Sequence, residues 1–317
     1  MFEGRRTFLP SLIAALAWGA MFPIAADALE RIDPFSLTAI RYGIATLVFL
    51  ALLRSIEGNV HAHGRHRELA VLGALGFAGF NLLTYVGLEH THPQNAALII
   101  ALQPLITALG LWLTTRQIPT RHTFVAMGFA LLGVFLVITK GHPASIFSGD
   151  GALGELLVLI GCACWIGYTL GARRFGEFTP LRYTALTAGY GTLAIIAATV
   201  VAVAVGEAHV PSTGDVGAVW WQTIYIFAIG AVVAVLAWNE GVRKIGPANA
   251  ALFLNLVPVI SFAIAISIQG YDPNGWELAG AALTIAALVY ANLRGRARAP
   301  RAHPHPGGVP ARAGRSA

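Results

Sequence analysis

A twelve-residue stretch that occurs twice constrains this chain more than any other feature of its sequence. Residues 93–104 read Pro-Gln-Asn-Ala-Ala-Leu-Ile-Ile-Ala-Leu-Gln-Pro, and residues 247–258, which follow 154 positions later, read Pro-Ala-Asn-Ala-Ala-Leu-Phe-Leu-Asn-Leu-Val-Pro. Seven of the twelve positions are identical, whereas unrelated apolar stretches would share about one. The chain is therefore predicted to be internally duplicated.

Both copies carry a proline where a membrane helix should continue. The first proline of each copy suits the first turn of a helix, but Pro104 and Pro258 lie inside apolar runs. A proline there has no N–H to donate and clashes one turn back, so the carbonyls of Ile100 and Leu254 should lose their usual partners. Two matching, interrupted segments in the two halves of a chain point to a transport site, and we expect hinges at Pro104 and Pro258.

Composition places nearly the whole chain in a membrane. The 317 residues are 56% hydrophobic and 11% charged, against about 25% charged in a soluble domain. Ten apolar segments of about 18 to 25 residues are each long enough to cross a hydrocarbon core of ~30 Å. We expect them near residues 9–29, 34–53, 69–89, 93–114, 122–140, 152–172, 180–205, 218–241, 247–269 and 274–293. The predicted fold class is an all-α integral membrane protein with ten transmembrane helices.

The distribution of charge predicts the orientation. The net charge is +6, but with the N-terminus inside, eighteen of the 21 Lys and Arg residues fall on one side of the membrane. Only Arg31 and Lys140 fall on the other side, and Arg41 lies within a segment. This is the positive-inside bias. We expect a multi-pass protein of the inner or plasma membrane with both termini cytoplasmic, in contact with lipid and a small-molecule substrate and not with nucleic acid.

The duplication predicts the domain organisation. The two five-helix repeats span residues 9–140 and 152–293, and residues 294–317 form a basic cytoplasmic tail whose composition predicts disorder. Because five is an odd number, equivalent helices should cross the membrane in opposite directions, which makes the halves inverted repeats. Matched positions outside the twelve-residue copies include Trp18 with Trp165, Thr38 with Thr184, Thr46 with Thr192 and Tyr85 with Asn239.

Arg41 is the charged residue that most needs an explanation. It lies seven residues into its segment, about 10 Å deep at 1.5 Å per residue. An arginine at membrane depth costs at least ~2.5 kcal/mol, so it must face protein or water and find a partner. Its counterpart in the second half is Thr187. Two interpretations remain open: a structural pair with Asp27 or nearby carbonyls, or the binding of a substrate carboxylate.

Aromatic and amide side chains mark the candidate interior. Trp18 and Phe22 share one helix face, and so do Trp165 and Thr169, with Tyr168 beside them. A tryptophan at the same position of both halves favours an inner wall over a lipid-facing belt. Polar groups in membrane helices face the bundle interior, where Asn81 and Asn239 would either join helices or line a cavity.

These residues together resemble a known family. The chain is similar, over about residues 9–293, to the drug/metabolite transporter superfamily, in its ten-helix branch with two EamA-type domains. The resemblance rests on Trp18-Gly19, on Asp33-Pro34 with Arg41, on the two Pro-x-Asn-Ala-Ala-Leu copies, and on Trp238-Asn239 followed by Gly246-Pro247.

The resemblance implies a secondary transporter that moves metabolites by alternating access, without ATP or a cofactor, as a monomer or homodimer. Export of amino acids or related small molecules is the first expectation, and a multidrug or sugar-type carrier is the alternative. The substrate-binding residues that it implies are Trp18, Phe22, Asn81, Tyr85, Gln103, Trp165, Tyr168, Trp238, Asn239 and Asn255.

Enzymatic function has little support in the sequence. The chain has no His-Glu-x-x-His, no Gly-x-Ser-x-Gly and no P-loop. His61, His63 and His66 lie close together, but no cysteine or carboxylate completes a set of metal ligands, so we expect no metal. An intramembrane enzyme remains a remote alternative.

Overall fold

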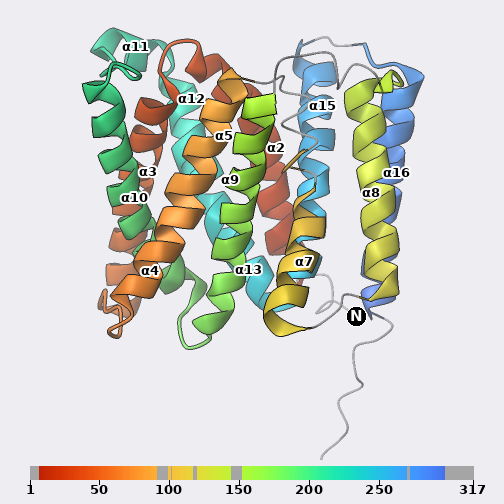
Figure 1. Ribbon diagram of the computed structural model, residues 1–317, viewed down its shortest axis with the longest axis horizontal. Coiled ribbons are helices and arrows are strands. Elements are labelled where there is room, and N and C mark those ends of the chain that lie inside the picture. Colours follow the sequence, from red (N-terminus) through yellow and green to blue (C-terminus); the bar gives the residue numbers. More distant parts are fainter. Residues whose placement is uncertain are drawn as a thin grey trace, which may run out of the picture.

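The chain folds into helices that stand side by side (Figure 1). The computed structural model describes residues 7–90, 99–100, 102–116, 120–143, 152–269 and 272–296, and the regular structure of these residues is helical throughout. In chain order the elements are α2 (Leu9–Leu29), α3 (Pro34–Glu57), α4 (His66–Gly73), η1 (Ala74–Gly79), α5 (Phe80–Glu89), α7 (Gln103–Thr115), α8 (Arg121–Thr139), α9 (Ala152–Gly171), η3 (Ala172–Arg174), α10 (Pro180–Ala204), α11 (Thr213–Ala218), α12 (Trp220–Ile224), η4 (Tyr225–Val233), α13 (Ala234–Ile245), α14 (Pro247–Leu252), η5 (Phe253–Asn255), α15 (Leu256–Gln269) and α16 (Gly275–Arg296).

The predicted apolar segments are mostly helical where the structure describes them, with turns inside two of them at residues 102 and 219. The first, residues 9–29, coincides with α2, whereas α3 continues four residues beyond its predicted end at residue 53. Among the described residues, five helices are long and apolar enough to cross a membrane: Pro34–Glu57, His66–Glu89, Leu153–Arg174, Pro180–Ala204 and Trp220–Ile245. Shorter apolar helices cover Leu9–Met21, Phe124–Gly133 and Pro247–Ser261.

Local sequence explains where the second helix of each repeat begins. The Asp33 carboxylate accepts a hydrogen bond from the backbone N–H of Ser36 (2.9 Å), and Thr179 Oγ1 accepts one from the backbone N–H of Arg182 (3.0 Å). Each cap satisfies a free N–H of a first helical turn that opens with proline. α3 ends at Gly58, whose φ of +73° suits a residue without a Cβ. The two halves therefore start these helices by the same device.

α3 and α10 pack against each other in opposite directions. Near the middle of both helices, the hydroxyl oxygens of Thr46 and Thr192 lie 2.7 Å apart. Phe35, in the first turn of α3, accepts a hydrogen bond at its carbonyl from Thr199, which lies near the end of α10 (3.2 Å). Thr46 and Thr192 hold equivalent positions in the two halves, so a residue here touches its own repeat counterpart.

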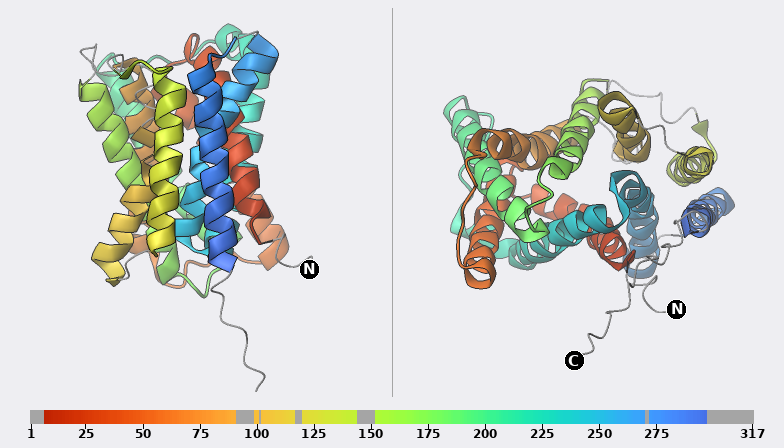
Figure 2. Two further views of the ribbon diagram at one scale, coloured as in Figure 1. Left: turned by 90° about the vertical axis from the view of Figure 1, so that its right-hand side faces the viewer. Right: turned by 90° about the horizontal axis from the view of Figure 1, so that it is seen from below.

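α8 and α16, which are also equivalent elements, pack antiparallel as well. Thr284 donates to the carbonyl of Ala130 (3.4 Å), and nearer the other end His122 lies 3.2 Å from the hydroxyl of Tyr290. A Cβ added to Gly133 would lie 2.5 Å from the carbonyl oxygen of Gly280, so the two backbones approach closely there. The α8–α16 pair and the α3–α10 pair stand at opposite ends of the molecule's long axis (Figures 1 and 2).

The structure contains two π-helical segments that the sequence analysis did not predict. η1 interrupts the helix from His66 to Glu89, and η4 interrupts the helix from Trp220 to Ile245. Residues 74–79 of η1 correspond, 154 positions later, to residues 228–233, which lie inside η4. π-helical turns are rare and are frequently found at functional sites. Their occurrence at equivalent positions indicates that the duplication preserved this irregularity.

The helix that contains Pro258 is irregular directly before this proline. α14 gives way to the 3₁₀ turn η5, and α15 follows from Leu256. In the other copy Leu102 forms a turn, and Pro104 lies in the first turn of α7, while residues 91–98 and 101 fall outside the described residues. The irregular turn at residues 253–255 lies just before Pro258, and bending and flexing at Pro104 and Pro258 stay predictions.

Candidate functional site

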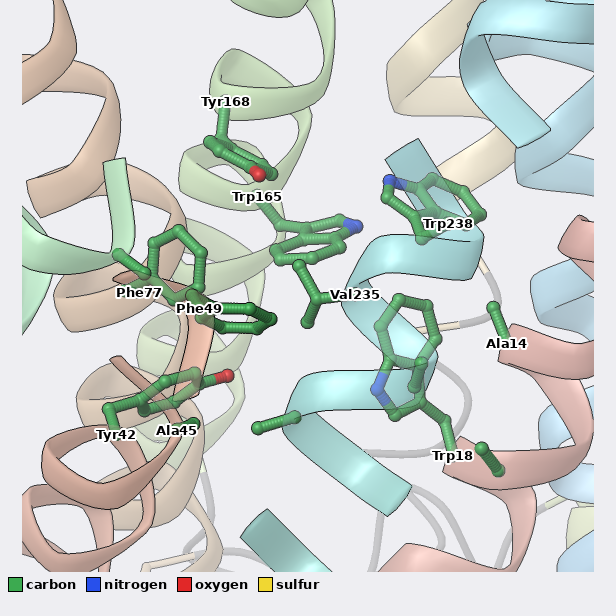
Figure 3. Packing of buried hydrophobic residues seen from close by; sticks show 14 of the residues in the cluster. Ala14, Trp18, Tyr42, Ala45, Phe49, Phe77, Trp165, Tyr168, Val235 and Trp238 are labelled. Atoms are coloured by element: carbon green, nitrogen blue, oxygen red, sulfur yellow. The ribbon is translucent and has the colours of Figure 1, made fainter. Parts of the chain in front are cut away.

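Three tryptophans meet in the middle of the molecule. Trp18 of α2, Trp165 of α9 and Trp238 of α13 have ring centroids 5.5 Å (Trp18–Trp165), 5.6 Å (Trp18–Trp238) and 6.0 Å (Trp165–Trp238) apart. All three are buried, and Figure 3 shows their rings gathered between the helices. Such pairs add about 0.5–1.5 kcal/mol each beyond the area they bury. This tryptophan cluster joins the two halves, because Trp18 and Trp165 are repeat counterparts.

Arg41 sits beside the tryptophan cluster and is only 2% exposed. Its Nη1 donates to Asn81 Oδ1 (3.0 Å) and to the hydroxyl oxygen of Tyr85 (3.1 Å), and its Nη2 donates to the carbonyl oxygen of Gly230 (3.0 Å). The same carbonyl accepts a hydrogen bond from Trp18 Nε1 (2.9 Å). We call Arg41, Asn81, Tyr85 and the Gly230 carbonyl the arginine cluster.

Among the described residues, the groups that contact this cation are neutral. Its guanidinium carbon lies 4.7 Å from the ring centroid of Tyr42, a cation–π geometry. The ion pairs among the described residues are Arg65 with Glu68 and Glu177, Arg182 with Glu57, and Glu240 with Arg243 and Lys244. The pair of Arg41 with Asp27, one of the alternatives that the sequence left open, is not formed, because the arginine bonds to α5 and to η4 instead. Its Nε is buried without a hydrogen-bond partner.

A second polar cluster borders the tryptophans through Tyr168, whose ring centroid lies 5.2 Å from that of Trp165. Asn239 Nδ2 donates to the hydroxyl oxygen of Tyr168 (2.6 Å) and to Thr184 Oγ1 (2.7 Å). Tyr183 donates from its hydroxyl to the carbonyl of Tyr168 (2.7 Å), and the two rings stack. Asn239 Oδ1 is buried without a partner. We call Asn239, Tyr168 and Thr184 the asparagine cluster.

The two clusters occupy corresponding places in the two repeats. Tyr85 corresponds to Asn239, and Gly76 of η1 corresponds to Gly230 of η4. A Cβ on Gly76 would lie 2.4 Å from Tyr168 Cγ, and a Cβ on Gly230 would lie 2.6 Å from Met21 Sδ. Since Met21 is the counterpart of Tyr168, each π-helical glycine accepts the side chain of an equivalent residue. The backbone framework is shared, and the side chains differ.

Gln103 and Asn255, the remaining predicted amides, are buried with unsatisfied atoms. Gln103 Nε2 lies 3.5 Å from the sulfur of Cys162, and its Oε1 has no partner. Asn255 is 0% exposed, and neither atom of its amide has a partner. An unmet buried polar group costs about 1–3 kcal/mol. These amides therefore have free hydrogen-bonding capacity for a ligand or for water.

The structure brings together most, but not all, of the residues that the sequence singled out. Hydrogen bonds or ring contacts link Trp18, Arg41, Asn81, Tyr85, Trp165, Tyr168, Trp238 and Asn239 into one connected group. Among the described residues, Gln103 and Asn255 make no hydrogen bond to this group, and the side chain of Phe22 lies outside the described residues. The sequence analysis missed Tyr42 and Gly230, although Gly230 stands 154 positions after Gly76, the spacing of the duplication.

A duplicated helical fold with apolar helices and a buried aromatic and polar junction defines a membrane transporter. The chain belongs to the EamA-like transporter family, whose sequence pattern matches residues 7–139 and 152–293. The family and the relatives found are transporters.

The relatives cover most of the chain. It is 33% identical over 291 residues to the uncharacterized transporter YrdR of Bacillus subtilis, covering 90% of both chains. It is 23% identical to a probable terminal-alkyne amino-acid exporter of Streptantibioticus cattleyicolor, covering 89% of this chain and 92% of that one. A solved crystal structure, 19% identical, superimposes with a TM-score of 0.74 over 92% of this chain and 99% of that chain. This last likeness concerns the fold alone.

Proposed function

We propose that this protein is a secondary transporter that exports amino acids or related small metabolites across the inner or plasma membrane by alternating access. The observation that carries the proposal is the tryptophan cluster, where Trp18 and Trp165 from equivalent positions of the two halves meet. Both polar clusters border it, so a ligand between the repeats would contact both halves. A site shared by two halves is what alternating access requires.

The proposed topology has ten transmembrane helices in two inverted repeats, with both termini cytoplasmic. Antiparallel packing of equivalent helices, α3 with α10 and α8 with α16, supports the inversion. Residues such as Thr46 and Thr192 touch their own counterparts, as expected only near a pseudo-two-fold axis that lies across the helices. The excess of Lys and Arg on one side supports the orientation. The site lies within one chain, so a monomer suffices, and a homodimer is compatible with it.

The proposed substrate is small and amphipathic. Aromatic walls would hold its apolar part by burial, at about 25 cal/mol per Å². The unsatisfied amide atoms of Gln103, Asn239 and Asn255 would meet its polar groups. Because burial is undirected and few polar groups fix the orientation, we expect broad specificity. The relative described as an amino-acid exporter favours amino acids over the alternatives, a multidrug or a sugar-type carrier.

Transport into inverted membrane vesicles tests the proposal. Vesicles that contain the protein should accumulate one or more members of a panel of labelled amino acids, whereas vesicles from cells without it should not. Accumulation of sugars or cationic drugs alone would favour the alternative carriers. Accumulation of nothing in the panel, by protein shown to be folded, would contradict a transport function for these substrate classes.

A further inference from the structure

Two buried arginines of this protein differ in how their charge is met. Arg182 of α10 lies 2.7 Å from a carboxylate oxygen of Glu57, and it also donates to Asn59 Oδ1 and to the carbonyl of His61. Arg41 is more deeply buried and has no carboxylate partner among the described residues. A buried charge without a counter-charge is strongly unfavourable, so a cation in this position calls for a reason.

The scaffold itself does not require a cation at this position. The counterpart of Arg41 in the second half is Thr187, which is fully buried and donates its hydroxyl to the carbonyl of Tyr183 in its own helix (2.6 Å). The same fold therefore accommodates a small neutral residue at the equivalent place. The charge of Arg41 is a feature of one half only.

The guanidinium of Arg41 can donate hydrogen bonds to one further ligand group. Its Nε is buried and has no hydrogen-bond partner. Nη2 donates a hydrogen bond to the carbonyl oxygen of Gly230. This oxygen also accepts a hydrogen bond from Trp18 Nε1, so it would keep one donor if the arginine turned away. Nε together with one Nη forms the fork that binds the two oxygens of a carboxylate. A carboxylate could thus bind here without leaving the Gly230 carbonyl unpaired.

We infer that Arg41 is the anchor for a carboxylate of the transported substrate, an inference that rests on the proposed function and names its substrate class. The ligand supplies the counter-charge that no described residue provides. Its apolar body then lies against the tryptophan cluster, whose Trp18 already donates to the carbonyl that Arg41 contacts. The substrates are therefore carboxylate-bearing molecules with an apolar part, and an amino group is not required for the anchor.

Matched acids and amides test this assignment on the purified full-length protein. The probes are L-phenylalanine and L-phenylalaninamide, L-leucine and L-leucinamide, and 3-phenylpropionate and 3-phenylpropanamide. Binding is followed by tryptophan fluorescence, since three of the seven tryptophans form the cluster. In the wild-type protein each bound acid should bind about 10- to 100-fold more tightly than its amide, the range expected for hydrogen bonds to a charged group. 3-Phenylpropionate lacks the ammonium group of L-phenylalanine, so comparing the affinities of these two acids separates the contribution of the carboxylate from that of the ammonium.

Variants identify the residue responsible. Arg41→Gln should weaken acid binding to the level of the amide and leave amide binding unchanged. Arg41→Lys, which keeps the charge but loses the planar fork, should restore part of the preference. Arg182→Gln is the matched control, because its charge already has a partner, and it should keep the full preference for acids. If Arg41→Gln does not fold, the inference is tested by the ratio of acid to amide affinity in the wild-type protein and by the reduction of this ratio in Arg41→Lys.

The inference is overturned if the wild-type protein binds amides as tightly as acids, if it binds none of the six probes, or if Arg41→Gln keeps the preference for acids. Vesicle transport separates this failure from a failure of the proposed function. Transport of the acids that Arg41→Gln leaves intact would remove the carboxylate anchor and keep the transporter. Absence of any transport would remove both.

Discussion

The arginine cluster and the asparagine cluster stand at corresponding places in the two repeats, yet they hold different chemistry. In the first, Arg41 brings a charge that three neutral acceptors share. In the second, Asn239 joins Tyr168 and Thr184 without any charge. The backbone framework is nearly the same, since both clusters border a π-helical glycine that accepts an equivalent side chain. The two halves therefore share a backbone framework, but among the described residues only the first half places a charged side chain beside the tryptophan cluster.

This difference suggests how duplication and transport fit together. Equivalent helices allow the two halves to exchange roles when the protein opens to one side or the other, as alternating access requires. In the proposed function, the unequal clusters would fix which end of a substrate faces which half. The predictions that follow compare equivalent positions, beginning with the largest expected effect.

The two π-helical glycines should differ in their tolerance of a methyl group. Gly76→Ala places a Cβ 2.4 Å from the ring of Tyr168, which is held by stacking on Tyr183 and by Asn239. We expect it to lower the free energy of unfolding by about 3 kcal/mol. Gly230→Ala meets the flexible thioether of Met21 and should cost about 1 kcal/mol. Denaturation in detergent measures both, and equal losses would contradict the rigidity assigned to the asparagine cluster.

The next comparison sets Arg41 against Thr187. Arg41→Leu leaves Asn81 Oδ1 and the Tyr85 hydroxyl without their donor, so the free energy of unfolding should fall by about 2 kcal/mol. Thr187→Val removes a hydroxyl that donates to carbonyls of its own helix, and the loss should be about 0.6 kcal/mol or less. Thermal unfolding of the two variants shows which one loses more stability. If neither variant changes stability or ligand binding, the hydrogen bonds of Arg41 contribute to neither.

The paired prolines should matter to rate more than to stability. Replacing both Pro104 and Pro258 with alanine allows a more regular helix in both halves, which would stiffen the interruption seen at η5. We expect slower turnover in vesicles from a double variant that remains folded. Each single variant serves as a control for the other half. Wild-type turnover in a folded double variant would count against hinges at these positions.

The smallest expected effect concerns the contact between Thr46 and Thr192. Their hydroxyl oxygens lie 2.7 Å apart between α3 and α10. A double-mutant cycle with Thr46→Val and Thr192→Val should give a coupling of about 0.6 kcal/mol, the average for such bonds between membrane helices. Zero coupling would indicate that these equivalent residues do not touch, and it would weaken the pseudo-two-fold axis.

The helices were predictable from sequence because length and hydropathy define them, and α2 has the predicted bounds. The need of Arg41 for a partner was also predictable, but the partner was not. Asp27 is close in sequence, whereas the Gly230 carbonyl is 189 residues away and belongs to a π-helical turn. Such a turn changes the hydrogen-bond register without changing the apolar pattern. The sequence shows that Gly76 and Gly230 are 154 residues apart, the spacing of the duplication. It does not show that each glycine makes room for a side chain, Tyr168 at Gly76 and Met21 at Gly230.

The central claim is that one substrate binds between the repeats, beside both clusters. Protection of an introduced cysteine tests it most directly, in a functional protein with Cys162 and Cys164 replaced by alanine. In inside-out vesicles, a transported substrate at ten times its apparent Michaelis constant should slow maleimide labelling of Asn239→Cys about tenfold, because about a tenth of the sites remain empty. The same should hold for Tyr85→Cys, while Lys244→Cys, at the exposed end of α13, should be labelled at an unchanged rate. Unprotected labelling at both positions 85 and 239 would place the substrate elsewhere and contradict the account.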